Sequence, residues 1–215
     1  MFSTELCSAW IDQLRTQVNF PPRPIILYGP NVIEPRDVIF YGEQGSSPLV
    51  YGPLKCQPLP FPSVLRAILQ HANTLDISSV VGRKPAMGYL NVALVSCFRS
   101  GRDSIGWHCD DMLPLGKDPY IFSLNLGGTR MFGFRHNQTK KQKWVRLQNG
   151  SVVIMLGRDL QLNYEHSVPK DDSVVERWNL SLRYHVKEKV AQAMGKYLKN
   201  NRDTISEEGV MKKYL

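Results

Sequence analysis

The segment ERWNLSLRYH, residues 176–185, alternates polar and apolar side chains. Neighbouring side chains of a β-strand point to opposite faces, so the polar residues share one face and the apolar residues share the other. The polar set is Arg177, Asn179, Ser181 and Arg183, and the apolar set is Trp178, Leu180 and Leu182. The pattern predicts a strand that turns its apolar face to a core and its cationic face to a site.

The two arginines of this strand restrict what that site can hold. Burying two guanidiniums is costly unless anions meet them. A dicarboxylate is a suitable ligand, because arginine binds a carboxylate through two parallel hydrogen bonds. The alternative is a pair of structural salt bridges with carboxylates of the chain itself, and the sequence leaves both readings open.

The rest of the chain is rich in short strand-like runs separated by Gly, Pro and polar turns. Residues 90–99 read as a buried strand, and further runs follow at 120–126, 130–136, 144–148 and 151–156. Regular spacing of short strands favours an all-β sandwich or barrel. Helical spacing of apolar residues appears at 4–18, at 62–75 and in the tail from 187.

Composition bounds the class of protein. The chain has 215 residues, 42% hydrophobic and 21% charged, which fits one soluble globular domain with no membrane span. The N-terminus does not resemble a secretion signal, and the four cysteines form no CxxC pair. We therefore expect a reducing intracellular compartment, nuclear or cytoplasmic.

The excess of basic residues indicates which binding partners the protein could have. The net charge of +8 fits a protein that meets phosphate, although surface solubility explains it equally well. Four cations gather in one segment: Lys140, Lys141, Lys143 and Arg146.

A second motif suggests a metal. In WHCDD, residues 107–111, His108 and Asp110 are two apart, so on a strand both face one side. Two histidines and one carboxylate form the iron(II) site of many oxygenases, with open positions for co-substrate and oxygen. Of the remaining histidines, His166 is the best candidate for the third ligand. Taken alone it is weak, and polar residues at a strand end are the alternative for the pair.

These motifs, in this order, resemble the AlkB family of iron(II)/2-oxoglutarate dioxygenases over about residues 22–186, closest to the members that repair alkylated DNA. The resemblance includes H108-x-D110, H166 and R177-x-N-x-S-x-R183. It extends to Pro35-Arg36, Tyr41-Gly42, the strand 90–99, GTRMFGFRH (128–136), NGSVVIML (149–156) and HSVPK (166–170).

The resemblance implies a mainly β fold with flanking helices around a double-stranded β-helix core, a jelly roll of the cupin type. It divides one globular domain into an N-terminal helix (1–21), nucleotide-recognition hairpins with a supporting helix (22–89), a catalytic core (90–186) and a C-terminal helical tail (187–215). The implied activity is oxidative dealkylation of N-alkylated bases in DNA or RNA. O₂ is consumed, 2-oxoglutarate becomes succinate and CO₂, and the alkyl group leaves as an aldehyde.

The resemblance also implies residue roles. His108, Asp110 and His166 would hold Fe(II), Arg177 the distal carboxylate of 2-oxoglutarate, and Arg183 its chelating end. The co-substrate pocket would include Asn179, Ser181, Ser96 and Phe98. Among the substrate residues, Tyr28 matches an aromatic that inserts into the base stack. Tyr51 and Trp107 would lie in the pocket wall. Asp111 and Met112 would lie near the flipped base. We expect a monomer with no membrane partner.

Three departures from the family pattern stand out. Ser96 and Phe98 replace an asparagine and a tyrosine that reach 2-oxoglutarate, so one hydrogen bond worth about 0.5–1.5 kcal/mol is lost unless another group compensates. Met112 replaces an acid that reads the base edge, which suggests a different base preference. The segment 75–89, with Arg83 and Lys84, is longer than expected.

Two other functions remain open at this point. The same chemistry could act on a protein or lipid, since Met112 and the altered strand 90–99 depart from the repair enzymes. The chain could also be a nucleic-acid binding module without catalysis, although it keeps all three metal ligands and both arginines.

Overall fold

A computed structural model of the chain describes residues 2–22, 25–26, 32–33, 35–51, 54–78, 90–110, 112–116, 119–172 and 175–200. Tyr28, Arg83, Lys84 and Asp111 lie outside the described residues.

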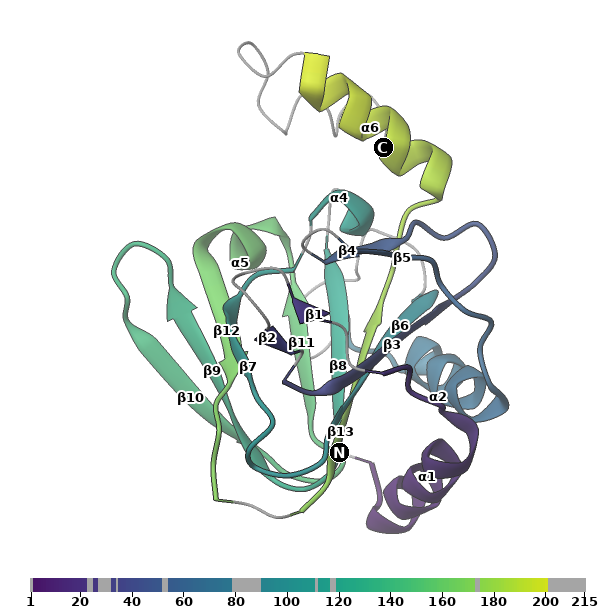
Figure 1. Ribbon diagram of the computed structural model, residues 1–215, viewed down its shortest axis with the longest axis vertical. Helices are drawn as coiled ribbons and strands as arrows, with labels where there is room; N and C mark the ends of the chain where they lie inside the picture. Colours follow the sequence, from purple (N-terminus) through teal and green to yellow (C-terminus); the bar gives the residue numbers. More distant parts are fainter. Residues whose placement is uncertain are drawn as a thin grey trace.

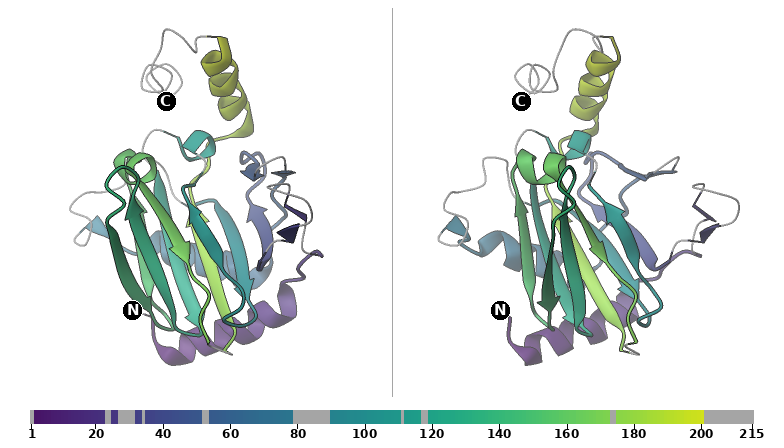
Figure 2. Two further views of the ribbon diagram at one scale, coloured as in Figure 1. Left: turned by 60° about the vertical axis from the view of Figure 1, so that its left-hand side comes forward. Right: turned by 90° about the vertical axis from the view of Figure 1, so that its left-hand side faces the viewer.

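Two antiparallel β-sheets form the body of the molecule and lie face to face (Figure 2). The five-stranded sheet has the order β11-β8-β13-β6-β3 and the four-stranded sheet the order β10-β9-β12-β7. The strands of the larger sheet are β3 (Asp37–Gly42), β6 (Val92–Phe98), β8 (Tyr120–Gly127), β11 (Val152–Leu156) and β13 (Arg177–Arg183). Those of the smaller sheet are β7 (Ile105–His108), β9 (Arg130–His136), β10 (Gln142–Leu147) and β12 (Tyr164–Val168). The predicted jelly roll is confirmed.

Strand β13 lies at the centre of the larger sheet, between β8 and β6. Its apolar residues Trp178, Leu180 and Leu182 are at most 2% exposed and belong to the largest hydrophobic cluster. Its polar residues face the other sheet. The alternation in residues 177–183 therefore predicts both faces correctly.

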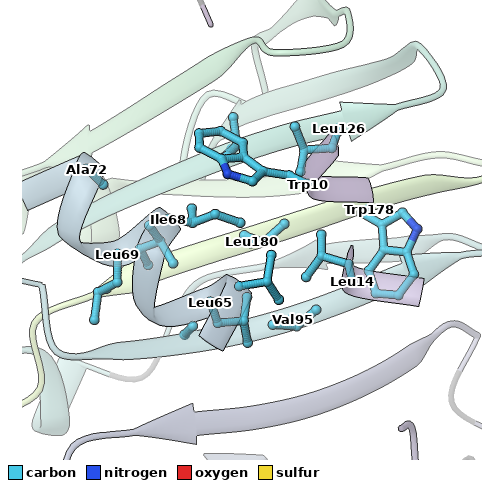
Figure 3. Packing of buried hydrophobic residues seen from close by; sticks show 14 of the residues in the cluster. Trp10, Leu14, Leu65, Ile68, Leu69, Ala72, Val95, Leu126, Trp178 and Leu180 are labelled. Atoms are coloured by element: carbon cyan, nitrogen blue, oxygen red, sulfur yellow. The ribbon is translucent and has the colours of Figure 1, made fainter. Parts of the chain in front are cut away.

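Two helices cover the apolar face of the larger sheet: α1 (Thr4–Gln17) and α2 (Ser63–Thr74) (Figure 1). Figure 3 shows Trp10 and Leu14 of α1 and Leu65 of α2 packed against Leu180 and Trp178 of β13. Burial of this apolar surface is the main stabilising contribution to the sheet.

The two helices are joined end to end by one side chain. The amide oxygen of Gln17, the last residue of α1, accepts hydrogen bonds from the Ser63 hydroxyl at 2.8 Å and the Val64 amide at 3.0 Å. It thereby satisfies a backbone donor at the start of α2, where Pro62 offers no side-chain cap. The helix expected at 62–75 therefore begins at Ser63, and a side chain of α1 caps it.

The remaining elements are shorter strand pairs and helices outside the two sheets. They are the strand pairs β1 (Ile25–Ile26) with β2 (Val32–Ile33) and β4 (Leu49–Tyr51) with β5 (Leu54–Cys56), and the helices α4 (Met112–Leu115), α5 (Arg158–Asn163) and α6 (Glu188–Asn200). Helix α5, which lies between β11 and β12, was not among the helices expected from the sequence. Among the described helices, none is long and apolar enough to cross a membrane.

Candidate metal centre

Three side chains converge between the sheets near the ends of β7 and β12. The antiparallel register of these strands sets His166 directly opposite His108, and Asp110 follows two residues beyond the end of β7. One ligand atom from each of the three residues lies within 4.8 Å of the other two. The ring centroids of the two histidines are 4.2 Å apart. The predicted ligand set is therefore assembled in one place.

The hydrogen bonds around the three residues leave metal-binding atoms available. The Nδ1 of His108 lies 2.9 Å from the carbonyl oxygen of Gly106, which can only accept, so Nδ1 carries the hydrogen and Nε2 keeps its lone pair. Within the described part of the chain, Asp110 Oδ2 is buried without a hydrogen-bond partner, and it lies 3.7 Å from His166 Nε2. A buried carboxylate oxygen between two imidazoles is what a divalent cation would satisfy.

The surroundings hold all three groups in the form that binds a metal. Burial, with His108 beside it, lowers the pKa of His166 to about 3, and burial also lowers the pKa of His108. Burial alone would raise the pKa of Asp110, but the Arg183 guanidinium, as the first of the lowering charges, brings it below its usual value. At neutral pH the site therefore offers two neutral imidazoles and one carboxylate.

Neighbouring side chains fix the ligands in position. The backbone amide of Asp110 donates to the side-chain oxygen of Gln161 in α5 at 3.2 Å. The ring of Phe132 in β9 stacks on His166 with centroids 5.6 Å apart. These contacts orient two of the three ligands before any ion is bound.

The polar face of β13 begins at this centre and runs away from it. Arg183 donates to Asp110 Oδ1 at 2.5 Å, which couples this guanidinium to the metal end of the strand. Arg177 lies six residues away with its guanidinium carbon 4.7 Å from the centre of the Phe98 ring. Its Nε donates to Asn125 Oδ1, and among the described residues its Nη1 has no partner. The salt-bridge reading thus applies to Arg183, whereas Arg177 keeps a buried donor for a ligand.

A narrow cavity between the sheets connects the metal centre to this face. It is lined by the two ligand histidines and by polar or aromatic residues of β6 and β13, among others. These include Ser96, Phe98, Asn179, Ser181 and Arg183. The amide of Asn179 donates to Ser123 Oγ at 2.8 Å, and the Ser181 hydroxyl donates to Asn179 Oδ1 at 3.3 Å. The residues predicted for the co-substrate lie on or beside one cavity, which fits a diacid that reaches the metal.

The predicted substrate residues are placed less completely. Tyr28 and Asp111 lie outside the described residues, and only the backbone of Tyr51, at the end of β4, and of Met112, at the start of α4, is described.

The position of Trp107 differs from the expected one in the pocket wall. Trp107 precedes His108 on β7 and does not line the cavity. Its ring lies 5.3 Å from that of Trp144 in β10, and the Arg135 guanidinium carbon lies 4.5 Å above it. The alternation of β7 sends the two side chains to opposite faces, so Trp107 lies on the outer face of the smaller sheet. Gly133 makes room for the pair, since a Cβ there would lie 2.5 Å from Trp144 and 2.8 Å from Trp107.

Sequence reasoning missed three residues of this site. Arg36, just before β3, lines the cavity, Asn125 of β8 binds Arg177, and Gln161 of α5 binds Asp110. For Asn125 and Gln161 the sequence holds no usable signal. Arg36 appears in the Pro35-Arg36 motif, which marks its position but not its direction.

Comparison with known proteins agrees with this geometry. The sequence profile described as 2OG-Fe(II) oxygenase superfamily matches residues 1–202. Alpha-ketoglutarate-dependent dioxygenase alkB homolog 3 of Homo sapiens is 30% identical over 186 residues, which cover 81% of this chain and 60% of that protein. DNA oxidative demethylase ALKBH2 of Homo sapiens is 29% identical over 158 residues, which cover 69% of this chain and 56% of that protein. The chain thus spans a little over half the length of these curated relatives.

Two solved structures share the fold. The structure of OsALKBH1 superposes with a TM-score of 0.54 at 17% identity and covers 86% of this chain and 93% of that one. A 2OG-Fe(II) family oxidoreductase from Burkholderia pseudomallei superposes with a TM-score of 0.58 at 13% identity and covers 84% and 79%. With the profile match, the two curated relatives and the assembled metal ligands, the chain belongs to the 2OG-Fe(II) oxygenase superfamily, as a member of its AlkB family.

Proposed function

We propose that the chain is an Fe(II)- and 2-oxoglutarate-dependent dioxygenase that removes N-linked alkyl groups from nucleic-acid bases, most simply those of alkylated DNA, with RNA as a further substrate. The observation that carries the proposal is the position of both ligand histidines and Arg183 on one narrow cavity. The third ligand, Asp110, pairs with Arg183, and the buried guanidinium of Arg177 lies against Phe98, which lines the same cavity. The names of the relatives, one of which is a DNA oxidative demethylase, support the substrate class.

His108, Asp110 and His166 would hold Fe(II) in this proposal. The Arg177 Nη1 would donate to the distal carboxylate of 2-oxoglutarate, and Arg183 would orient the chelating end while it holds Asp110. When bound, the iron and the co-substrate supply the oxidation: O₂ is consumed, 2-oxoglutarate becomes succinate and CO₂, and the hydroxylated alkyl carbon leaves as an aldehyde.

The chain's own residues then bind, orient and exclude water. Phe132, Met155 and Val168 line the cavity with apolar surface next to the histidines, which keeps water from the metal side of the pocket. Asn179 and Ser181 are already fixed by hydrogen bonds, so the polar lining needs little reorganisation when a diacid enters.

A nucleic-acid substrate fits the surface of the β9–β10 ribbon. Lys140, Lys141, Lys143 and Arg146 are exposed on or next to β10, and Trp144 on the same strand is 39% exposed. Cations that bind phosphate beside an aromatic ring that stacks on a base are typical of single-strand binding. Because the metal lies inside the sandwich, the target base has to leave its stack or arrive single-stranded.

A protein or lipid substrate of the same chemistry, and a binding module without catalysis, are the competing functions. Neither accounts for the exposed cations on β10 and the intact ligand set together. We further propose that the enzyme acts as a monomer in a reducing intracellular compartment, with nucleus and cytoplasm both open.

The test is turnover on a panel of single- and double-stranded oligonucleotides. Each carries 1-methyladenine, 3-methylcytosine or N6-methyladenine, and the unmodified sequences serve as controls. Fe(II), 2-oxoglutarate and protein should form succinate faster with at least one modified strand, and His108→Ala should abolish the reaction. Absence of stimulation by every modified strand, with succinate still formed without substrate, would assign the same chemistry to another substrate class.

A further inference from the structure

Arg36 enters the co-substrate cavity from a strand that the β13 arginines do not share. It precedes β3, whose register with β6 pairs Asp37 with Cys97, so residue 36 lies in line with Phe98. On the other side of β6, Phe98 pairs with Arg177. Arg36 and Arg177 therefore lie on the two sides of one phenylalanine, in the same row of the larger sheet.

The side chain of Arg36 is 5% exposed and points into the site. Its Nε donates to Ser96 Oγ at 3.3 Å, and its guanidinium carbon lies 5.9 Å from the centre of the Phe98 ring. It lines the same cavity as the ligand histidines and Arg183. Both residues that Arg36 contacts here, Ser96 and Phe98, are positions at which the chain departs from its family.

Three guanidiniums surround the Phe98 ring, and their charges are not equally compensated. Arg130, at 5.6 Å from the ring centre, is paired with Asp171 at 2.7 Å and donates to backbone carbonyls. Arg177 has no carboxylate partner in the described residues, and burial together with Arg130 and Arg36 lowers its pKa to about 9. An anion at this end of the cavity would relieve the repulsion between Arg36 and Arg177.

We propose that Arg36 is a binding residue for the distal carboxylate of 2-oxoglutarate, together with Arg177, and that it takes over the hydrogen bond lost with the hydroxyl absent at Phe98. The inference rests on the proposed use of 2-oxoglutarate but not on the nature of the oxidised substrate. The competing role for Arg36 is contact with the nucleic acid, which the experiment separates from the first.

The first measurement is the Kd of 2-oxoglutarate for the full chain loaded with Mn(II), by calorimetry and without nucleic acid. Arg36→Gln removes one charge-assisted hydrogen bond, so the Kd should rise roughly 10- to 100-fold. The Kd of Arg36→Lys should lie between those of the wild type and Arg36→Gln. 2-Oxobutyrate, which lacks the distal carboxylate, should bind wild type and Arg36→Gln equally. Arg66→Gln, an exposed cation on α2, is the control and should leave both values unchanged.

The second measurement restores the hydroxyl. Phe98→Tyr should tighten 2-oxoglutarate binding in the Arg36→Gln background by a larger factor than in wild type, because the two groups serve the same carboxylate. Circular dichroism establishes whether each variant is folded. If Arg36→Gln does not fold, the same comparison is made with Phe98→Tyr in the Arg36→Lys background. An unchanged Kd in the Arg36 variants, an equal loss for 2-oxobutyrate, or weakened oligonucleotide binding alone overturns the proposal. None of these outcomes depends on which substrate is oxidised.

Discussion

Arg177→Met should make the metal-free protein more stable while it removes the response to 2-oxoglutarate. The Arg177 side chain is 1% exposed and its pKa falls from 12.5 to about 9. Since one pKa unit corresponds to about 1.4 kcal/mol, burying this charge costs the free protein roughly 5 kcal/mol. Arg177→Met also loses the hydrogen bond to Asn125, which offsets about 1–3 kcal/mol of this gain. The expected net gain is about 2–4 kcal/mol, or a Tm higher by about 4–16 °C for a chain of this size.

Arg130→Met is the matched control, because Arg130 is equally buried and packs on the same Phe98 ring. Its guanidinium donates to the carbonyls of Ser100 and Asp103 and pairs with Asp171 at 2.7 Å. Methionine there should cost about 3–5 kcal/mol, since it breaks a compensated pair.

Urea unfolding in the presence of a chelator measures both variants. Thermal unfolding with Mn(II) and 2-oxoglutarate at 100 times the wild-type Kd measures the response, which should be about 2.7 kcal/mol for wild type and near zero for Arg177→Met. A metal-free Arg177→Met protein destabilised as much as Arg130→Met would refute the reasoning, because the guanidinium would then be a structural support and not an unmatched charge.

Three further predictions concern the site and its surface. Asp110→Asn should abolish metal binding and lower the free energy of unfolding of the metal-free protein by roughly 3–5 kcal/mol, because Arg183 loses its carboxylate partner. His108→Ala should also abolish metal binding but lower the free energy of unfolding much less. Calorimetry measures the metal binding, and urea unfolding measures the stability. Burial lowers the pKa of His185 to about 4, whereas the same residue in the unfolded chain binds a proton near pH 6.5. Because the folded state then binds fewer protons, the free energy of unfolding of the metal-free protein should fall by about 2 kcal/mol from this group between pH 7 and pH 5. His185→Asn should reduce this pH dependence, as urea unfolding at several pH values would measure. Trp144→Ala should weaken single-strand binding by about 1–3 kcal/mol with an unchanged salt slope, whereas changing Lys143 to Gln should lower the slope by roughly 0.7, as titrations at several salt concentrations would show.

The period-two pattern of residues 177–183 was sufficient to predict how β13 is used. A central strand with one face on helices and one on a cavity needs that alternation, and nothing beyond the local sequence is required to read it. The burial of Trp178, Leu180 and Leu182 against α1 and α2 follows from the same pattern. The local spacing of His108 and Asp110 likewise predicts that both face one ion.

Pairings between distant segments are not written in any local pattern. His166 was only a weak candidate on local pattern and gained weight through the family resemblance, because its place opposite His108 depends on the register of two strands more than fifty residues apart. Trp107 was expected in the pocket wall, yet its neighbour His108 takes the inner face, and Gly133 and Trp144 of other strands accommodate the indole outside. The contact of Gln161 with Asp110 depends on helix α5, which has only six residues and was not expected from the sequence.

The two faces of β13 explain how the chain tolerates such an unfavourable site. On the inner face, the buried guanidinium of Arg177 raises the free energy of the metal-free protein, because it has no anionic partner among the described residues. On the outer face of the same strand, fully buried tryptophan and leucine side chains join the largest hydrophobic cluster, whose burial offsets that cost. Because the arginines lie on a central strand of the sheet, paired on both sides, they stay in position without a ligand. Binding energy from a diacid then goes into satisfying charges that are already aligned, rather than into ordering them.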